Sequence, residues 1–147
     1  MPAPEERPKY SLLEIERRWL VDLARVGSLA RLPFKRLEDA YWPGTRLRLR
    51  QVIDPDGRTT YKFGIKYGES ARGVQPVTNL YLDKAEYEAL AAAGGLRVSK
   101  RRYLIAGGCL DVFDIPAGTP AYFEVEFGSE QEAQAYEPPP FVTEEIT

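Results

Sequence analysis

The stretch that decides the fold is SLLEIERRWLV, residues 11–21, in which two glutamates and two arginines stand among apolar residues. In a strand, alternate side chains share a face, which would place Glu14, Glu16 and Arg18 together. In a helix, apolar residues at helical spacing would form one stripe, and Ser11 with Glu14 would make a capping box. Both interpretations fit this stretch taken alone, so the rest of the chain has to decide between them.

The composition predicts one soluble domain in a reducing compartment. A chain of 147 residues suits a single domain, and a net charge of −2 argues against wholesale electrostatic binding to nucleic acid or to an anionic membrane. Cys109 is the only cysteine, so no disulfide can form within the chain, and no run is apolar enough for a signal peptide or a bilayer span. We therefore expect a cytoplasmic protein with a disordered lead-in over residues 1–10 and one domain over residues 11–147.

The absence of histidine narrows the possible chemistry. Without histidine, Ser-His and Cys-His nucleophilic catalysis and histidine-ligated zinc are excluded, and a single cysteine excludes thiolate zinc sites. A metal would have to be a hard cation held by carboxylates. A general base would have to be Asp, Glu, Lys, Tyr or a metal-bound water.

From residue 35 onward, the patterns predict mostly short strands. The expected strands cover residues 46–53, 59–68, 77–82, 96–106, 109–115 and 121–128, and the expected helices cover residues 83–95 and 129–136. DPDGR at 54–58 and the glycine pair at 107–108 are turn signals that join neighbouring strands into hairpins. The chain is therefore predicted to be an α+β protein with about seven or eight strands, largely antiparallel.

Charged residues recur at every second position in strand after strand, and each strand carries mainly one sign. A solvated outer face would explain any one such strand, but solvated faces usually mix the two signs. A closed sheet with a charged interior and helices packed outside explains the whole set. The inward groups would then be Arg18, Arg46, Arg48, Arg50, Lys62, Lys66, Lys100 and Arg102 against Glu14, Glu16, Asp111, Glu124 and Glu126. Such a cavity calls for a polyanion together with divalent cations.

Six of these charged segments also occur in a familiar order. They are EIERRWLV, RLRLR, FGIK, SKRRY, LDVFD and FEVEF, followed by the ending PPPFVTEEIT. Together they resemble the bacterial CYTH domain, or triphosphate tunnel metalloenzyme, family. Strands of that family carry Glu-x-Glu-x-Lys, Arg-x-Arg, Thr-x-Lys, Lys-x-Arg, an aspartate and Glu-x-Glu in that order. The resemblance runs from about Leu13 to the last residue, and it favours the strand over the helix for residues 11–21.

The resemblance implies an eight-stranded antiparallel closed β-barrel, a tunnel that binds triphosphate compounds and hydrolyses them with Mg²⁺ or Mn²⁺. The residues implied as metal ligands are Glu14, Glu16, Asp111, Glu124 and Glu126, and Arg18 joins Glu14, Glu16, Glu124 and Glu126 in the catalytic set. The residues implied as phosphate ligands are Arg46, Arg48, Arg50, Lys62, Lys66, Lys100 and Arg102. Arg50 and Lys62 are expected nearer the tunnel mouth, where a solvated role is the alternative. An ordinary salt-bridge lattice is the alternative for the carboxylates.

Two departures from the family pattern bear on the metal. The family usually has an acidic Arg-x-Glu-x-Glu strand where this chain has VTNLYL, residues 77–82, with no carboxylate. Arg18 stands in the place of the first motif's lysine, and Gly64 in the place of the threonine before Lys66. Arginine stays charged and cannot act as a base. We expect one cation to bind well and a second poorly.

The expected function is hydrolysis of inorganic tripolyphosphate or a nucleoside triphosphate, by in-line attack of water on a terminal phosphoryl group. Thiamine triphosphate is a further candidate substrate. A non-catalytic binder of polyphosphate or a nucleotide is the main alternative, because an acidic strand is missing, and an adenylate cyclase activity is a second one. The partner is expected to be a small molecule, with no nucleic acid and no membrane. The sequence leaves the oligomeric state open, a homodimer included.

Overall fold

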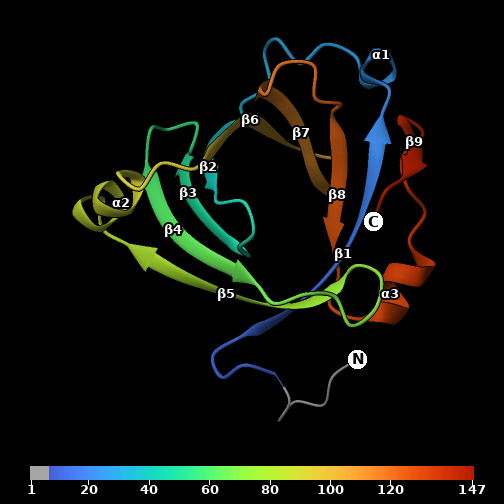
Figure 1. Cartoon of the computed structure of the whole chain (residues 1–147). Coiled ribbons are helices and arrows are strands. Elements are labelled where there is room, and N and C mark those ends of the chain that lie inside the picture. Colours follow the sequence, from blue (N-terminus) through green and yellow to red (C-terminus); the bar gives the residue numbers. More distant parts are fainter. Residues whose placement is uncertain (1–6) are drawn as a thin grey trace.

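The computed structural model describes residues 7–147, which form a barrel of strands with three short helices outside it (Figure 1). The strands are β1 (Leu12–Val21), β2 (Lys35–Tyr41), β3 (Leu47–Ile53), β4 (Thr59–Lys66), β5 (Val74–Leu82), β6 (Leu96–Ile105), β7 (Gly108–Ile115), β8 (Tyr122–Glu126) and β9 (Val142–Glu145). The helices are α1 (Leu23–Val26), α2 (Lys84–Ala91) and α3 (Glu130–Ala135). No helix in this part of the chain is both long and apolar enough to cross a membrane.

Eight of the strands close into an antiparallel barrel through β1. The sheet order is β5-β4-β3-β2-β6-β7-β8-β1-β9, and an additional pairing of β5 with β1 completes the ring. β1 pairs with β8 along one edge and with β5 and then β9 along the other. The predicted α+β fold with a closed eight-stranded barrel is confirmed. Because residues 12–21 form a strand, the helical interpretation of the opening stretch is wrong.

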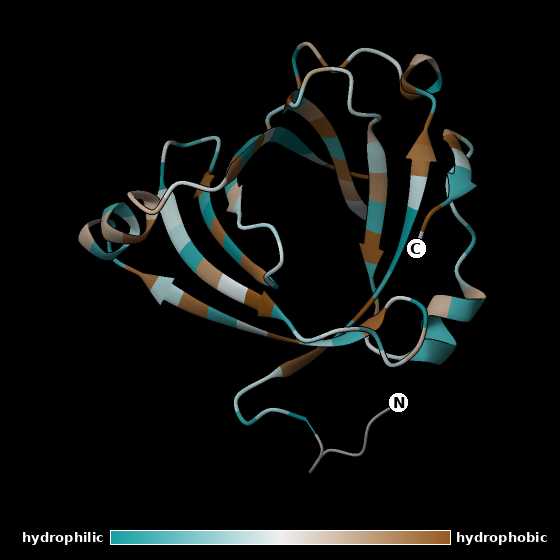
Figure 2. Ribbon diagram, in the orientation of Figure 1, coloured by the Kyte–Doolittle hydropathy of each residue, from teal (hydrophilic) through white to brown (hydrophobic). Residues whose placement is uncertain are grey.

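The strand registers keep the alternation in phase around the barrel. Glu16 lies opposite Glu126 and Arg50 lies opposite Lys62, so charged residues of neighbouring strands share the inner face. Hydrophilic and hydrophobic residues alternate along the strands in Figure 2. The sequence pattern of period two therefore corresponds to a charged lumen and an apolar outer wall.

The main apolar core lies outside the barrel, against the outer faces of β1, β6, β7 and β8. Its buried members are Trp19, Tyr103, Leu110, Ala121, Phe123, Val125 and Phe141. The segment that runs from α3 to β9 covers this core, and Arg17 fixes the segment in place. The Arg17 guanidinium donates to Ala133 O at 2.7 Å, to Tyr136 O at 3.2 Å and to Glu145 Oε1 at 2.9 Å. Apolar burial and this partly buried ion pair stabilise β1 on its outer face.

The strand β2 was not among the predicted elements. Its sequence, KRLEDAY, puts charges on both faces, so it shows no apolar alternation. The outward Arg36 and Glu38 form ion pairs on the surface, with Asp114 at 3.3 Å and with Arg97 at 3.4 Å, while Asp39 points inward and is buried. Cross-strand partners, which a single strand does not reveal, stabilise it.

Other boundaries differ by a few residues from those predicted. β5 begins at Val74 rather than at residue 77, since its first residues pair with β1 and close the barrel. α2 ends at Ala91 rather than at residue 95, and its start is a capping box between Asp83 and Glu86. Of the expected disordered lead-in, residues 1–6 lie outside the described residues. Residues 8–11 form a turn in which the Ser11 N–H donates to Pro8 O at 3.1 Å.

Candidate active site

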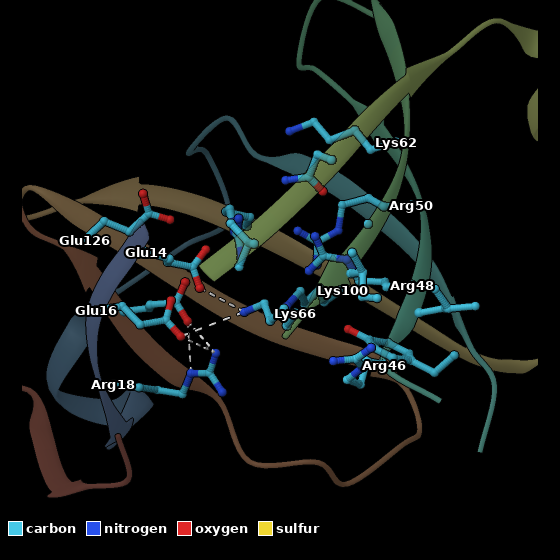
Figure 3. A pocket seen from close by; sticks show the side chains of 18 of the residues that line it. Glu14, Glu16, Arg18, Arg46, Arg48, Arg50, Lys62, Lys66, Lys100 and Glu126 are labelled. Carbon is cyan, nitrogen blue, oxygen red and sulfur yellow. Dashed lines mark hydrogen bonds and ion pairs between the residues drawn. The ribbon is translucent and has the colours of Figure 1, made fainter. Parts of the chain in front are cut away.

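The lumen of the barrel contains a cavity of about 470 Å³ lined by charged side chains. Twelve of the thirteen residues predicted for the site line it, contributed by β1, β3, β4, β6, β8 and the turn before β3. Figure 3 shows that the charges are separated: Glu14, Glu16 and Glu126 lie on one side, and Arg46, Arg48 and Lys62 lie on the other. The site thus has an acidic half and a basic half.

The acidic half is built by β1 and β8, where Glu14, Glu16 and Glu126 can bring one oxygen each within 4.8 Å of one another. We call these three residues the acidic cluster. Burial, reinforced by the charges of Glu124 and Glu14, raises the pKa of Glu16 to about 7. Burial and the charges of Glu14 and Glu124 also raise the pKa of Glu126. The cluster is therefore short of positive charge when no cation is bound.

Glu124 lies beside the acidic cluster but is engaged by Arg18. The Arg18 guanidinium donates to Glu124 Oε2 from Nε at 3.0 Å and from Nη2 at 2.5 Å. Burial disfavours the charged carboxylate, but Arg18 outweighs it and lowers the pKa of Glu124. Glu124 thus serves first as the counter-ion of Arg18.

Asp111, expected among the metal ligands, is buried beneath Lys100 and Arg102 on the inner face and is not part of the acidic cluster. It is 0% exposed, and it accepts from Arg102 Nε at 2.8 Å, Arg102 Nη2 at 2.8 Å and Lys100 Nζ at 2.7 Å. Although burial opposes ionisation, these cations lower the pKa of Asp111 to about 2. Burial in turn lowers the pKa of Lys100 to about 8. Asp111 thus anchors Lys100 and Arg102, and both of its oxygens accept hydrogen bonds from them.

The basic half contains cations that no carboxylate neutralises directly. Among residues 7–147, no acidic oxygen lies within 4 Å of Arg46, Arg48 or Lys62. Burial and the charges of Arg50 and Arg48 lower the pKa of Lys62. Clustered like charges of this kind form a site for an anion.

Arg50 and Lys66 connect the basic half to the rest of the wall. Arg50 is only 7% exposed and forms a bidentate pair with Asp39, at 2.7 and 2.8 Å, so it is not solvated at the tunnel mouth. Lys66 lies between the two halves (Figure 3), where its Nζ is 3.0 Å from Glu14 Oε1 and 4.0 Å from Glu16 Oε1. Lys66 therefore borders both halves at once.

The carboxylate-free strand β5 contributes Val77 and Asn79 to the cavity. Asn79 lies opposite Gly64, and a Cβ atom at Gly64 would lie 2.5 Å from Asn79 Oδ1. A threonine at position 64 would require the exposed Asn79 side chain to move aside. The two departures from the family pattern, at position 64 and in β5, are thus linked by packing.

The sequence reasoning missed Asp39 and Tyr122. Asp39 holds Arg50, and β2 was not recognised as a strand, so no signal pointed to it. Tyr122 lines the cavity and shares its parity with Glu124 and Glu126 on β8, so extending the alternation by one step could have found it.

Comparisons with known proteins agree with this architecture. No family model matches the chain. The inorganic triphosphatase of Nitrosomonas europaea is 36% identical over 146 residues, covering 92% of this chain and 90% of that protein. A crystal structure of the hypothetical protein NE1496 superposes with a TM-score of 0.51 at 30% identity, over 91% of this chain and 89% of that one. A crystal structure of the inorganic triphosphatase NE1496 gives 0.50 at 28% identity, over 91% and 86%.

Proposed function

Because the chain belongs to the triphosphate tunnel, or CYTH, family, we propose that it is a divalent-metal-dependent hydrolase of triphosphate compounds, with inorganic tripolyphosphate as the preferred substrate. The observation that carries the proposal is the division of one cavity into an acidic cluster and a basic half. An anion of high charge density that also binds metal matches both halves. The similar inorganic triphosphatase supports the same substrate class.

The acidic cluster fits a hard divalent cation such as Mg²⁺ or Mn²⁺. Its members are carboxylates, and burial together with the charges of Glu14 and Glu124 raises the pKa values of Glu16 and Glu126. A cation there would relieve this repulsion, and Glu14, Glu16 and Glu126 are the residues that would hold it. Bound there, it would supply Lewis-acid chemistry to the reacting phosphoryl group and the attacking water.

The basic half would hold the remaining phosphates of the chain. Arg46, Arg48 and Lys62 have no carboxylate partner within 4 Å in the described part of the chain, so a phosphate oxygen would be their nearest counter-charge. Arginine can grip phosphate through two parallel N–H donors. Positive charge fixed in this position would also stabilise the negative charge that develops on the departing phosphate.

The aromatic groups of the cavity favour an inorganic substrate over a nucleotide. Only Tyr41 and Tyr122 contribute aromatic rings to its lining. The ring of Tyr122 is covered by Arg18, at 4.3 Å, and by Lys100, at 5.1 Å. Tyr41, 37% exposed, is the one remaining ring on which a base could stack. A second aromatic wall for a nucleobase is missing from the described lining.

A polyphosphate sensor is the second candidate, favoured by the carboxylate-free β5 strand. Such a protein would bind tripolyphosphate in the basic half without releasing phosphate. Binding and product release therefore have to be measured separately.

The test is phosphate release from tripolyphosphate and from ATP with Mg²⁺ or Mn²⁺, repeated with EDTA. We expect metal-dependent release from tripolyphosphate, lowered about 100-fold or more in Glu14→Gln and Glu126→Gln. Glu88→Gln on the exposed face of α2 is the matched control and should behave like wild type. Titration with Mn²⁺ should show one bound ion in wild type and weaker binding in Glu126→Gln. Full activity in Glu14→Gln would refute the assignment of Glu14 as a metal ligand. Tight binding of tripolyphosphate without release of phosphate would identify a sensor.

A further inference from the structure

Tyr122 connects two cations of the cavity that the sequence motifs treat as independent. It lies on β8, two residues before Glu124, and it lines the cavity. Its hydroxyl accepts from Lys100 Nζ at 2.7 Å, and its ring lies 4.3 Å from the guanidinium carbon of Arg18. Phe113 packs edge-on against the ring, with centroids 5.5 Å apart, and so fixes its orientation. Tyr122 therefore makes a separate contact with each cation.

The Tyr122 hydroxyl determines where the Lys100 ammonium group points. A lysine ammonium has three N–H donors. On Lys100, one donor goes to Asp111 Oδ2 at 2.7 Å and one to the Tyr122 hydroxyl at 2.7 Å. With two donors fixed, the geometry of the ammonium leaves the third for a ligand in the cavity. Without the hydroxyl, Asp111 would be the one remaining hydrogen-bond acceptor for the Lys100 ammonium, which would keep only the looser ring contacts with Phe113 and Tyr122 at 5.3 and 5.1 Å and could rotate about the Asp111 contact.

The Tyr122 ring determines the plane of the Arg18 guanidinium. Arg18 uses Nε and Nη2 on Glu124, which fixes one edge of the group. The ring of Tyr122 covers one face of it. No hydrogen bond within residues 7–147 involves Nη1, which is thereby available to a phosphate oxygen. The edge contact and the face contact together leave the guanidinium little freedom.

We infer that Tyr122 is a positioning residue that sets Arg18 and Lys100 at the spacing required to bind two phosphate oxygens of one polyphosphate. This inference rests on the proposed function, which supplies the substrate class. The two contacts are chemically separable, because phenylalanine keeps the ring and loses the hydroxyl. Tyr122→Phe should therefore affect Lys100 alone, and Tyr122→Leu should affect both cations.

The test measures tripolyphosphate binding by calorimetry in EDTA, where no hydrolysis occurs, together with kcat and KM in Mg²⁺. We expect the Kd to rise about tenfold in Tyr122→Phe and further in Tyr122→Leu, with KM following Kd and kcat changing less. Tyr87→Phe removes a hydroxyl outside the barrel, where Tyr87 stacks on Tyr61, and is the matched control. Its Kd should equal that of wild type.

A double-mutant cycle assigns the effect to Lys100. In a Lys100→Met background the Tyr122→Phe change should leave Kd unaltered, since the hydroxyl has lost its partner. Asp111 keeps its bidentate bond from Arg102 in that background, so the variant is expected to fold. An undiminished effect of Tyr122→Phe beside methionine would overturn the coupling to Lys100.

The possible outcomes separate this inference from the proposed function. Wild-type Kd and KM in both Tyr122→Phe and Tyr122→Leu would overturn the positioning role and leave hydrolysis standing. A lowered melting temperature with unchanged Kd would show a structural role only and would overturn it too. Tyrosine-dependent binding without phosphate release would refute hydrolysis and support the positioning role. A wild-type protein that does not bind tripolyphosphate would refute both.

Discussion

Replacing Glu16 with glutamine is expected to stabilise the metal-free protein while it removes a ligand of the acidic cluster. Burial and the charges of Glu124 and Glu14 raise the pKa of Glu16 from 4.5 to about 7, so the ionised carboxylate is held at a cost in the folded state. Arg18 Nη2 at 3.6 Å and Lys66 Nζ at 4.0 Å attract the carboxylate, but burial and the neighbouring carboxylates outweigh this attraction. A neutral amide of the same shape gives up this attraction but removes the larger cost of burying the charge beside other carboxylates.

The magnitude follows from the pKa difference between the folded and unfolded states. At about 1.4 kcal/mol per pKa unit, a shift of the Glu16 pKa from 4.5 to about 7 destabilises the folded state by about 3 kcal/mol once both states are ionised. The side chain is only 12% exposed, so solvent screens little of this. For a chain of this size the gain corresponds to roughly 6–10 °C in melting temperature.

The raised pKa of Glu16 also determines how the stability gain of Glu16→Gln depends on pH. Between pH 4.5 and 7 the folded state binds more protons at Glu16 than the unfolded state does, so wild-type stability falls as the pH rises through this window. The advantage of Glu16→Gln should be complete above pH 7 and absent below pH 4.5. Urea unfolding in EDTA at pH 4, 6 and 8 measures it, with Glu88→Gln as control. Addition of Mg²⁺ should stabilise wild type and leave the variant nearly unchanged.

Two results would refute this reasoning. The first is a Glu16→Gln variant no more stable than wild type at pH 8, which would mean that attractive contacts of the carboxylate offset the cost of burying its charge. The second is a stability difference that persists at pH 4, which would show that it does not arise from ionisation of Glu16.

Three further predictions concern the seam of the barrel, the C-terminal ion pair and the basic half. Gly73→Ala should lower the free energy of unfolding by about 2 kcal/mol or more, because φ is 76° there and the new Cβ would clash with the carbonyl oxygen of Glu16. Gly94→Ala is the control: φ is 80° but the space around it is open, so it should cost about 1 kcal/mol. Hydrogen bonding from Arg17 lowers the pKa of Glu145 to about 2, so the ion pair should add about 1 kcal/mol, after screening, to the free energy of unfolding above pH 4.5. This contribution is lost as the pH falls toward 2, and urea unfolding of Glu145→Gln across the same pH range should lack the loss. The Kd for tripolyphosphate in EDTA should rise steeply between 50 mM and 500 mM NaCl, and a salt-independent Kd would argue against the basic half as the anion site.

The inner face of the barrel could be predicted because alternation is a local property of each strand. Charged residues at every second position predicted which face of β1, β3, β4, β6 and β8 points into the lumen. A closed sheet was the arrangement that could accommodate all of these charged faces. The turn at Gly107, with φ 77°, and the caps at Asp83 and Ser129 were likewise readable from neighbouring residues. These features depend on short-range geometry alone.

The missing parts depend on long-range pairing. The strand β2 looks irregular by itself, and only the partners of Asp39 and Glu38 on β3 and β6 make it a strand. Asp111 was placed with the metal ligands because its type and parity fit, but two cations from β6 engage its oxygens. Alternation along a strand predicts which face of the sheet a side chain lies on, but not which neighbouring side chain it contacts.

The position of the apolar core makes one wall of the barrel stiffer than the other. β1 and β6–β8 are backed by a cluster of buried aromatic side chains, whereas β3–β5 contribute few buried apolar side chains, Leu49 and Val74 among them, and are backed by α2, a helix with no buried residue (Figure 1). The metal-ligand candidates stand on the stiff wall, and most of the unneutralised cations stand on the compliant one. Amide hydrogens of β3–β5 should therefore exchange faster than those of β1 and β8. Mechanically, a compliant basic wall would adjust its position to polyphosphates of different length, while the carboxylates on the stiff wall would keep their spacing.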